Sequence, residues 1–125
     1  RVADDGSADV FASDLGIACG LAFADDGTLF VGDRSGTIFA VDSRGRATAL
    51  ATLPSSVAAF HLALGPDGLF VTAPTLSARD AIFRVGLDGR VDVYHDGFGR
   101  PQGLGFAPDG SLCVVEALAG GAGLY

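Results

Sequence analysis

Short apolar runs alternate with turn-forming residues along the whole chain. In the middle third, these runs cover residues 60–64, 69–73, 81–85 and 90–95, and each is rich in Val, Leu, Ile or Phe. Gly, Pro, Asp and Ser fill most of the gaps between the runs, as they do between strands of antiparallel sheets. No stretch keeps apolar residues at i, i+3, i+4 and i+7 for longer than about one helical turn. The pattern therefore predicts short β-strands joined by tight turns.

The pattern is repeated three times along the chain. Asp-Gly pairs begin at Asp26, Asp67 and Asp109, which are 41 and 42 residues apart. Each pair lies between two apolar runs, in GLAFADDGTLFV, HLALGPDGLFV and GLGFAPDGSLCVV, where Asp and Gly tolerate the left-handed backbone of a turn. The segment DDGSADVFASDLGIACGLAF at 4–23 is similar to LDGRVDVYHDGFGRPQGLGF at 87–106, two periods later. We therefore expect the same hairpin in every unit.

Four strands per unit at this period indicate a β-propeller blade. We expect an all-β chain: a β-propeller fragment of about three four-stranded antiparallel blades, half of a six-bladed propeller. A single partial propeller spans 1–125, with an outer strand of a preceding blade at 1–16, blades at 17–56 and 57–99, and an incomplete blade at 100–125. Three blades leave two open flanks. Either missing blades or a second copy must close the ring, and an isolated chain is expected to form a homo-oligomer.

Composition and charge narrow the range of partners. The chain has 125 residues, 49% of them hydrophobic, which is enough for one modest core. Its net charge is −7 and its eight basic residues are dispersed, so neither nucleic acid nor a membrane surface is an expected partner. No apolar run approaches the length of a membrane span. We expect a soluble protein, and the sequence leaves the cytoplasm and the periplasm open. Cys19 and Cys113 match no zinc-binding spacing and are expected to be free thiols.

Candidate functional residues fall where propeller blades meet the central channel. The start of each inner strand and the end of the following strand crowd one mouth of that channel. His61 and Gln102 lie at the starts of two inner strands, and Asp33 and Glu116 end two second strands. Two carboxylates, an amide and an imidazole suit Ca²⁺, Mg²⁺ or Mn²⁺, and the imidazole adds affinity for Zn²⁺. The sequence predicts a divalent cation held by Asp33, Gln102 and Glu116.

Catalytic and substrate-binding roles are expected at the same mouth. His61 and Asp33 are candidates for activating water, and Arg34 and Arg100 are candidates for holding an anionic group of the substrate. Each residue also has a structural interpretation. Asp33 suits the hairpin turn that follows it, Gln102 suits loop backbone groups, and His61 suits a channel lining. An exposed arginine on a loop often has no partner at all. The sequence leaves these alternatives open.

Two stretches carry a resemblance to a known family. HLALGPDGLFVTAPTLSARDAIFRV at 61–85 and FGRPQGLGFAPDGSLCVVEALAGGAGLY at 98–125 resemble the regucalcin/gluconolactonase (sugar lactone lactonase-like) family, and NHL-repeat propellers are also similar. The resemblance implies a six-bladed propeller that holds a divalent cation at its channel mouth and hydrolyses sugar lactones. Gln102 stands where the family has an Asn ligand, and Asp33 and Glu116 stand where it has an Asp ligand.

The chain also departs from the family pattern. Cys19 and Phe60 occupy the Asn position in the other two units, and Ala73 occupies the acidic position in the middle unit. The chain is therefore expected to hold only part of a cation site. The resemblance implies a metal-dependent sugar-lactone hydrolase, with a small-molecule lactone as substrate. A non-catalytic NHL-like propeller that binds protein or glycan is the alternative. A further one is a virginiamycin-inactivating type of lyase, which resembles this chain in a blade ending in an acidic residue, here Glu116.

Overall fold

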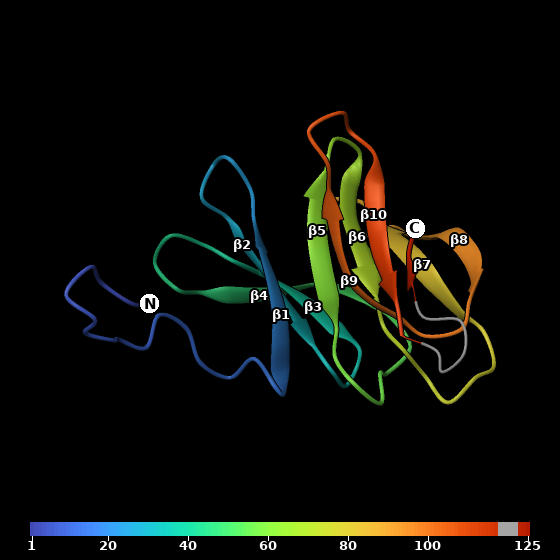
Figure 1. Cartoon of the computed structure of the whole chain (residues 1–125). Coiled ribbons are helices and arrows are strands. Elements are labelled where there is room, and N and C mark those ends of the chain that lie inside the picture. Colours follow the sequence, from blue (N-terminus) through green and yellow to red (C-terminus); the bar gives the residue numbers. More distant parts are fainter. Residues whose placement is uncertain (118–122) are drawn as a thin grey trace.

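The computed structural model describes residues 1–117 and 123–125, and within them the chain is all-β (Figure 1). The first antiparallel sheet contains β1 (Ala18–Phe23), β2 (Leu29–Asp33), β3 (Thr37–Val41) and β4 (Ala47–Thr52). The second contains β5 (His61–Gly65), β6 (Gly68–Thr72), β7 (Asp80–Val85) and β8 (Val91–Phe98). The third contains β9 (Pro101–Phe106), β10 (Leu112–Glu116) and β11 (Gly123–Leu124), in the order β11-β10-β9. The expected fold class is confirmed.

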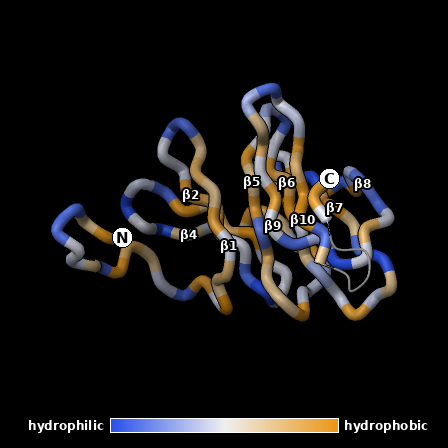
Figure 2. Tube along the Cα trace, in the orientation of Figure 1, coloured by the Kyte–Doolittle hydropathy of each residue, from blue (hydrophilic) through white to orange (hydrophobic). Residues whose placement is uncertain are grey.

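The apolar runs of the sequence mark the strands closely. In the middle unit, β5, β6, β7 and β8 overlap the four expected runs, and only β8 extends well beyond its expected end. The agreement has a simple cause, which Figure 2 shows: apolar residues follow the strands, and the tips of the hairpins are hydrophilic. A strand that is packed on both faces buries every side chain, and all five residues of β2 and of β6 are buried. β2 and β6 are thus interior strands that are covered on both faces.

The three Asp-Gly hairpins are not identical. In the first unit Ala24 and Thr28 are joined by a backbone hydrogen bond across the turn, and Gly27 has a φ of 87°. In the middle unit the turn is shorter, because Gly65 already pairs with Gly68, which has a φ of 129°. Leu69 follows that glycine directly, whereas the sister units insert Thr or Ser. Only glycine adopts such a backbone without strain, so the shared Asp-Gly serves two different turns.

Consecutive sheets pack face to face through small and large residues. We call the face of each sheet that contacts the following sheet its forward face, and the opposite one its rear face. On the forward face of the first sheet, a Cβ atom on Gly32 would lie 2.6 Å from the Cβ of Phe60, a fully buried side chain of the second unit. On the forward face of the second, Gly65 lies against the ring of Phe106. Small residues in one blade therefore receive large ones from the next.

The inner strands lie side by side, since β5 contacts both β1 and β9. This order, with each blade following the last around a common line of inner strands, is the arrangement expected of consecutive propeller blades. The main core cluster lies between the first two sheets and includes Ile38, Phe60, Leu69 and Val71. A smaller cluster joins the second and third sheets. The packing between blades, rather than within a single sheet, forms the core.

The first sixteen residues contain one isolated bridge, between Val2 and Ala8, and pair with none of the three sheets. Phe11, Ala12 and Leu15 pack instead on the rear face of the first sheet. The outer strand expected in this segment therefore stays a prediction, because no sheet edge of a preceding blade is beside it. In the expected incomplete blade at 100–125, residues 118–122, part of the glycine-rich stretch ALAGGAGLY, lie outside the described residues.

The state of the two cysteines and the lack of an apolar membrane span are also predicted from the sequence. Cys19 and Cys113 are both free thiols, as the spacing predicted. The part of the chain that the structure describes contains no helix long and apolar enough to cross a membrane.

Candidate functional site

The starts of the inner strands and the ends of the second strands lie along one edge of the three sheets. The strand pairs at this edge are Ala18 with Asp33, His61 with Thr72, and Pro101 with Glu116. Because the inner strands adjoin one another, the three sheets bring these ends to a shared border. We call it the mouth edge; it contains Asp33, Arg34, His61, Thr72, Arg100, Gln102 and Glu116. The expected grouping of the site residues at one end of the blades follows from this topology.

Asp33 is buried, and its carboxylate is used within its own blade. Oδ1 accepts hydrogen bonds from the backbone N–H of Ile17 at 2.8 Å and of Ser35 at 3.1 Å, and Oδ2 accepts one from the Ser35 hydroxyl. The Ser35 hydroxyl holds the pKa of Asp33 below its usual value, burial opposes it, and the two N–H groups add to the lowering. The carboxylate thus joins the start of β1 to the turn after β2.

Glu116 occupies the equivalent place in the third unit and makes the equivalent contact. Its Oε1 accepts from the N–H of Arg100 and its Oε2 from the N–H of Gly99, both at 2.7 Å. Glu116 is buried as well. In the middle unit, where this position is Ala73, the hydroxyl of Ser56 takes over by donating to the carbonyl of Pro74 at 2.7 Å. A polar group therefore ties each inner strand to its neighbour at the mouth edge.

These contacts bear on the expected cation site. Both oxygens of Asp33 and both of Glu116 already accept hydrogen bonds from their own blades. Among the described residues, no three His, Cys, Asp or Glu side chains gather closely enough to hold a metal ion. Gln102 is half-buried, and its backbone carbonyl accepts from the Thr72 hydroxyl at 2.5 Å. The cation-ligand roles of Asp33, Gln102 and Glu116 therefore stay a prediction, and they require ligand bonds from carboxylates that already accept hydrogen bonds in this arrangement.

His61 differs from the acidic residues because none of the described residues gives its side chain a polar partner. It is half-buried at the start of β5, where the sister units have Gly20 and Gly103. No group in residues 1–117 or 123–125 forms a hydrogen bond or ion pair with its imidazole. His95, the second histidine, is exposed on β8 and stacks near Phe98 with a centroid separation of 5.0 Å. His61 is therefore available to an incoming molecule at the mouth edge.

Arg34 and Arg100 flank this histidine along the mouth edge. Their backbones are held, since Arg34 N–H donates to the carbonyl of Ile17 at 3.1 Å and Arg100 N–H donates to Glu116. Both side chains are exposed, and within the described residues neither guanidinium has a hydrogen bond or ion pair. Anchored backbones with unpaired guanidinium groups are suited to binding an oxygen-rich or anionic ligand. The role of Arg34 and Arg100 in holding an anionic group of the substrate therefore stays a prediction.

Sequence reasoning missed the hydroxyl groups that support the mouth edge. Ser35 bonds to Asp33, Ser56 replaces the missing carboxylate of the middle unit, and Thr72 ties β6 to β9. Only Ser35 had a visible signal, because a Ser two residues after an Asp is typical of a side-chain-capped turn. The other two act across different parts of the fold, so their spacing in the chain gives no indication.

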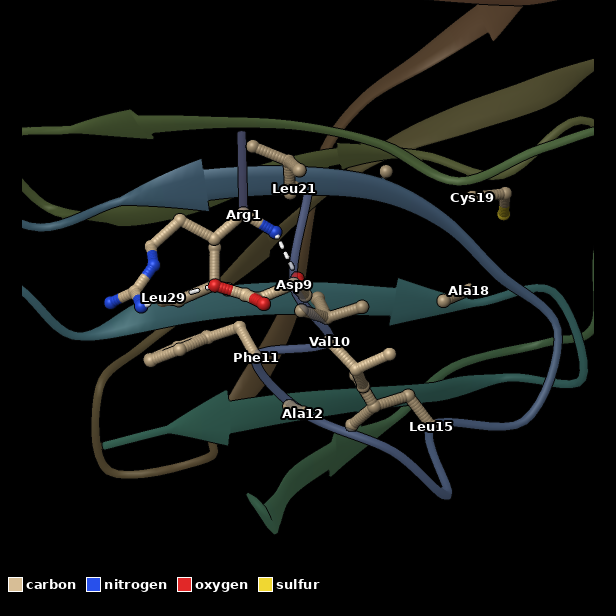
Figure 3. A pocket seen from close by; sticks show the side chains of 12 residues that line it. Arg1, Asp9, Val10, Phe11, Ala12, Leu15, Ala18, Cys19, Leu21 and Leu29 are labelled. Atoms are coloured by element: carbon tan, nitrogen blue, oxygen red, sulfur yellow. Dashed lines mark hydrogen bonds and ion pairs between the residues drawn. The ribbon is translucent and has the colours of Figure 1, made fainter. Parts of the chain in front are cut away.

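A large apolar hollow lies away from the mouth edge, on the rear face of the first sheet (Figure 3). It measures about 670 Å³ and is lined mostly by apolar side chains, among them Phe11, Leu15, Leu21, Leu29 and Val31. At its rim the Arg1 amino group donates to the backbone carbonyl of Asp9 at 2.7 Å. The hollow presents few polar groups for orienting a small substrate. It corresponds instead to the surface on which a preceding blade would pack.

Replacement of Asp33 by asparagine should reduce the acid sensitivity of folding. The pKa of Asp33 is lowered in the folded protein, so its carboxylate stabilises the fold fully above the pKa of the unfolded chain, and that contribution is lost as pH falls through the folded pKa. Urea unfolding between about pH 3 and pH 7 should show a shallower fall of the unfolding free energy in Asp33→Asn. Asp25→Asn removes an exposed aspartate as the control. Identical pH profiles for Asp33→Asn and the wild type would contradict this role.

Comparison with known proteins supports the class to which the chain belongs. No protein-family model matches the sequence, and a search of curated proteins gives no match. Solved structures do match. A glucose dehydrogenase-type oxidoreductase from Thermus thermophilus has a TM-score of 0.67 and 25% identity over 85% of this chain and 38% of its own. The PQQ-bound aldose sugar dehydrogenase of Streptomyces coelicolor also has a TM-score of 0.67 and 25% identity, and the match covers 88% of this chain and 40% of the dehydrogenase.

Virginiamycin B lyase from Staphylococcus aureus has the same TM-score, 0.67, with 16% identity over the whole of this chain and 47% of its own. The dehydrogenases and the lyase are β-propeller enzymes, and the three sheets described above match parts of them. The chain is thus a β-propeller fold that spans less than half the length of each of these proteins. The resemblance to regucalcin and gluconolactonase is not confirmed by these comparisons, and the lyase shares the fold alone.

Proposed function

We propose that this chain forms part of a propeller enzyme that opens a sugar lactone, with His61 as the proton-transfer group. The observation that carries the proposal is the half-buried imidazole of His61, which is held on an inner strand at the mouth edge and has no polar partner within the described part of the chain. An imidazole nitrogen can accept a proton and then return it, so His61 is suited to moving a proton during ester hydrolysis. The two dehydrogenases with 25% identity, one for glucose and one for aldose sugars, support the sugar class of substrate.

The chemistry follows from the groups at the mouth edge. His61 accepts a proton from a water molecule as that water attacks the lactone carbonyl carbon. The ring C–O bond then breaks, and the proton passes from His61 to the departing oxygen, which yields an open hydroxy acid. Negative charge develops on the carbonyl oxygen as the water attacks, and the guanidinium groups of Arg34 and Arg100 stabilise it there. The open hydroxy acid then loses its carboxyl proton to bulk water, and the same two groups bind the product carboxylate. The sequence of steps uses no metal ion, because the acidic residues are engaged in hydrogen bonds within their own blades.

A sugar-lactone panel tests this function directly. We expect the purified 125-residue chain to release acid from five- or six-membered sugar lactones faster than buffer alone, followed by proton release at constant pH and by NMR of the product. The same protein should show no reaction with an open-chain sugar acid. Binding of lactones without any acid release would favour the non-catalytic NHL-like propeller. Elimination products, distinguished by a new C=C bond in the NMR spectrum, would favour the lyase instead.

A further inference from the structure

The third sheet lacks a fourth strand among the described residues, whereas the first two sheets have four each. Its outer strand β11 pairs only with β10. The Val114 and Tyr125 backbones exchange two hydrogen bonds, 2.9 and 3.0 Å long, so the backbone N–H and C=O of Leu124, one residue earlier, point to the open edge. Leu124 is 71% exposed. An open edge of this kind is a template for another strand.

A spare fourth-strand sequence lies at the other end of the molecule. Residues 8–15 align with β8 of the second sheet at the 83-residue offset of the repeat, DVFAS matching DVYHD. The structure already holds this segment as a fourth strand would lie. Gly89 of the second unit lies close to β4 of the first sheet, because a Cβ added to it would be 2.5 Å from the carbonyl oxygen of Leu50. A Cβ added to Gly45, the equivalent residue of the first unit, would be equally close to the carbonyl oxygen of Phe11. Segment 8–15 therefore lies against the first sheet in the same position that β4, the fourth strand of the first sheet, takes against the second sheet.

The two open flanks match the two interfaces already formed inside the chain. Within the chain, small residues of a forward face receive large residues of the next rear face. On the open rear face of the first sheet, Leu21 and Phe23 are each 61% exposed. On the open forward face of the third sheet, Gly103 and Gly105 have nothing within 4 Å of an added Cβ, and an apolar hollow of about 450 Å³ lies over them. Leu21 and Phe23 are the large residues that such a face receives.

From these observations we infer that a second copy of this chain fills both flanks, so that two copies close a six-bladed ring. The rear face of each copy packs on the forward face of the other, and segment 8–15 of each adds to β11 of the other as its missing fourth strand. The occupant is a second copy because this chain carries both halves of the contact and repeats the same contact twice internally. A head-to-tail contact that closes after two copies forms a ring rather than a filament. Six blades fall within the usual range of about 4–8.

The repeat also gives the strand register of the exchanged strand. Leu124 is equivalent to Ile82 of β7, which pairs with His95 of β8, and His95 is equivalent to Ala12 at the 83-residue offset. Leu124 of one copy should therefore lie opposite Ala12 of the other. Within a single chain the two residues are at opposite ends of the array, as the termini show in Figure 1. A covalent bond between positions 12 and 124 can then join only two different chains.

Cysteine cross-linking and mass measurement test the ring. Residues directly opposite in antiparallel strands have Cα atoms roughly 4.5–5.5 Å apart, within the range that a disulfide spans. We expect the double variant Ala12→Cys, Leu124→Cys to run at twice the 12.6 kDa chain mass without reductant, and to return to one chain mass with it. The two single variants control for Cys19 and Cys113. A double variant that cross-links no better than the single ones would overturn the strand exchange.

Light scattering of the wild type should give the mass of two chains. Gly103→Val should give a single-chain mass with an unchanged circular dichroism spectrum, because its side chain meets nothing within one copy. Phe23→Asp should do the same, whereas Leu87→Asp, at a position that is also 61% exposed, should leave the dimer intact. A wild-type mass of one chain at every concentration would overturn the proposal and indicate that blades of another sequence fill the flanks. Masses that grow beyond two chains would overturn the closed ring.

Discussion

Replacement of His61 by alanine should lower the rate of sugar-lactone opening by about 10²–10⁴-fold, the usual contribution of a general acid–base group. The loss should fall on kcat more than on KM, because Arg34 and Arg100 still bind the substrate while the proton has no acceptor. His61 has no polar partner among residues 1–117 and 123–125, so its removal should leave urea unfolding nearly unchanged. Steady-state kinetics and denaturation on the same preparation separate these two effects.

The second histidine provides the matched control. His95 is exposed on β8, away from the mouth edge, and His95→Ala should keep full activity. Equal activity of His61→Ala and the wild type would show that His61 is a channel-lining residue. A loss of activity in both histidine variants would point to another cause.

Replacement of Phe60 by alanine should lower the free energy of unfolding by about 3–5 kcal/mol, the range for a buried phenylalanine. Phe60 is fully buried between the first two sheets, where its ring and backbone fill the space that Gly20 and Gly32 leave open. The loss is large because the two glycines have no side chains that can move into the cavity. Urea unfolding at a fixed protein concentration should show a lower midpoint with a similar slope.

The same denaturation experiment has a simple control and a clear contradiction. Leu87→Ala changes a side chain that is 61% exposed on the turn before β8, and its effect should stay within about 0.5 kcal/mol. If Phe60→Ala were no more destabilising than Leu87→Ala, the packing between blades would not be the core of the molecule. The fold would then depend on each sheet by itself.

The acidic residues show where inference from sequence ends. Their position at the ends of β2 and β10 follows from the repeat, and the sequence placed Asp33 and Glu116 at one edge of the sheets. Ligand and structural roles look the same in a sequence, because both use a carboxylate after an apolar strand. Only the fold shows that these carboxylates accept hydrogen bonds from the backbone N–H groups of Ile17, Gly99 and Arg100. The hydrogen-bond partners of a buried charge lie far apart in the chain, so local pattern cannot supply them.

The sequence by itself determined the elements and their order. Apolar runs, Asp-Gly turns and a fixed period depend on local backbone preferences and on which side chains must leave water, and these are properties of short stretches. The tertiary structure decided which face meets which. The difference between small forward faces and large rear faces depends on contacts between units about 40 residues apart. So does the place of His61 at the mouth edge, where no described residue bonds to its ring. Contacts of that kind appear only when the blades are placed against one another.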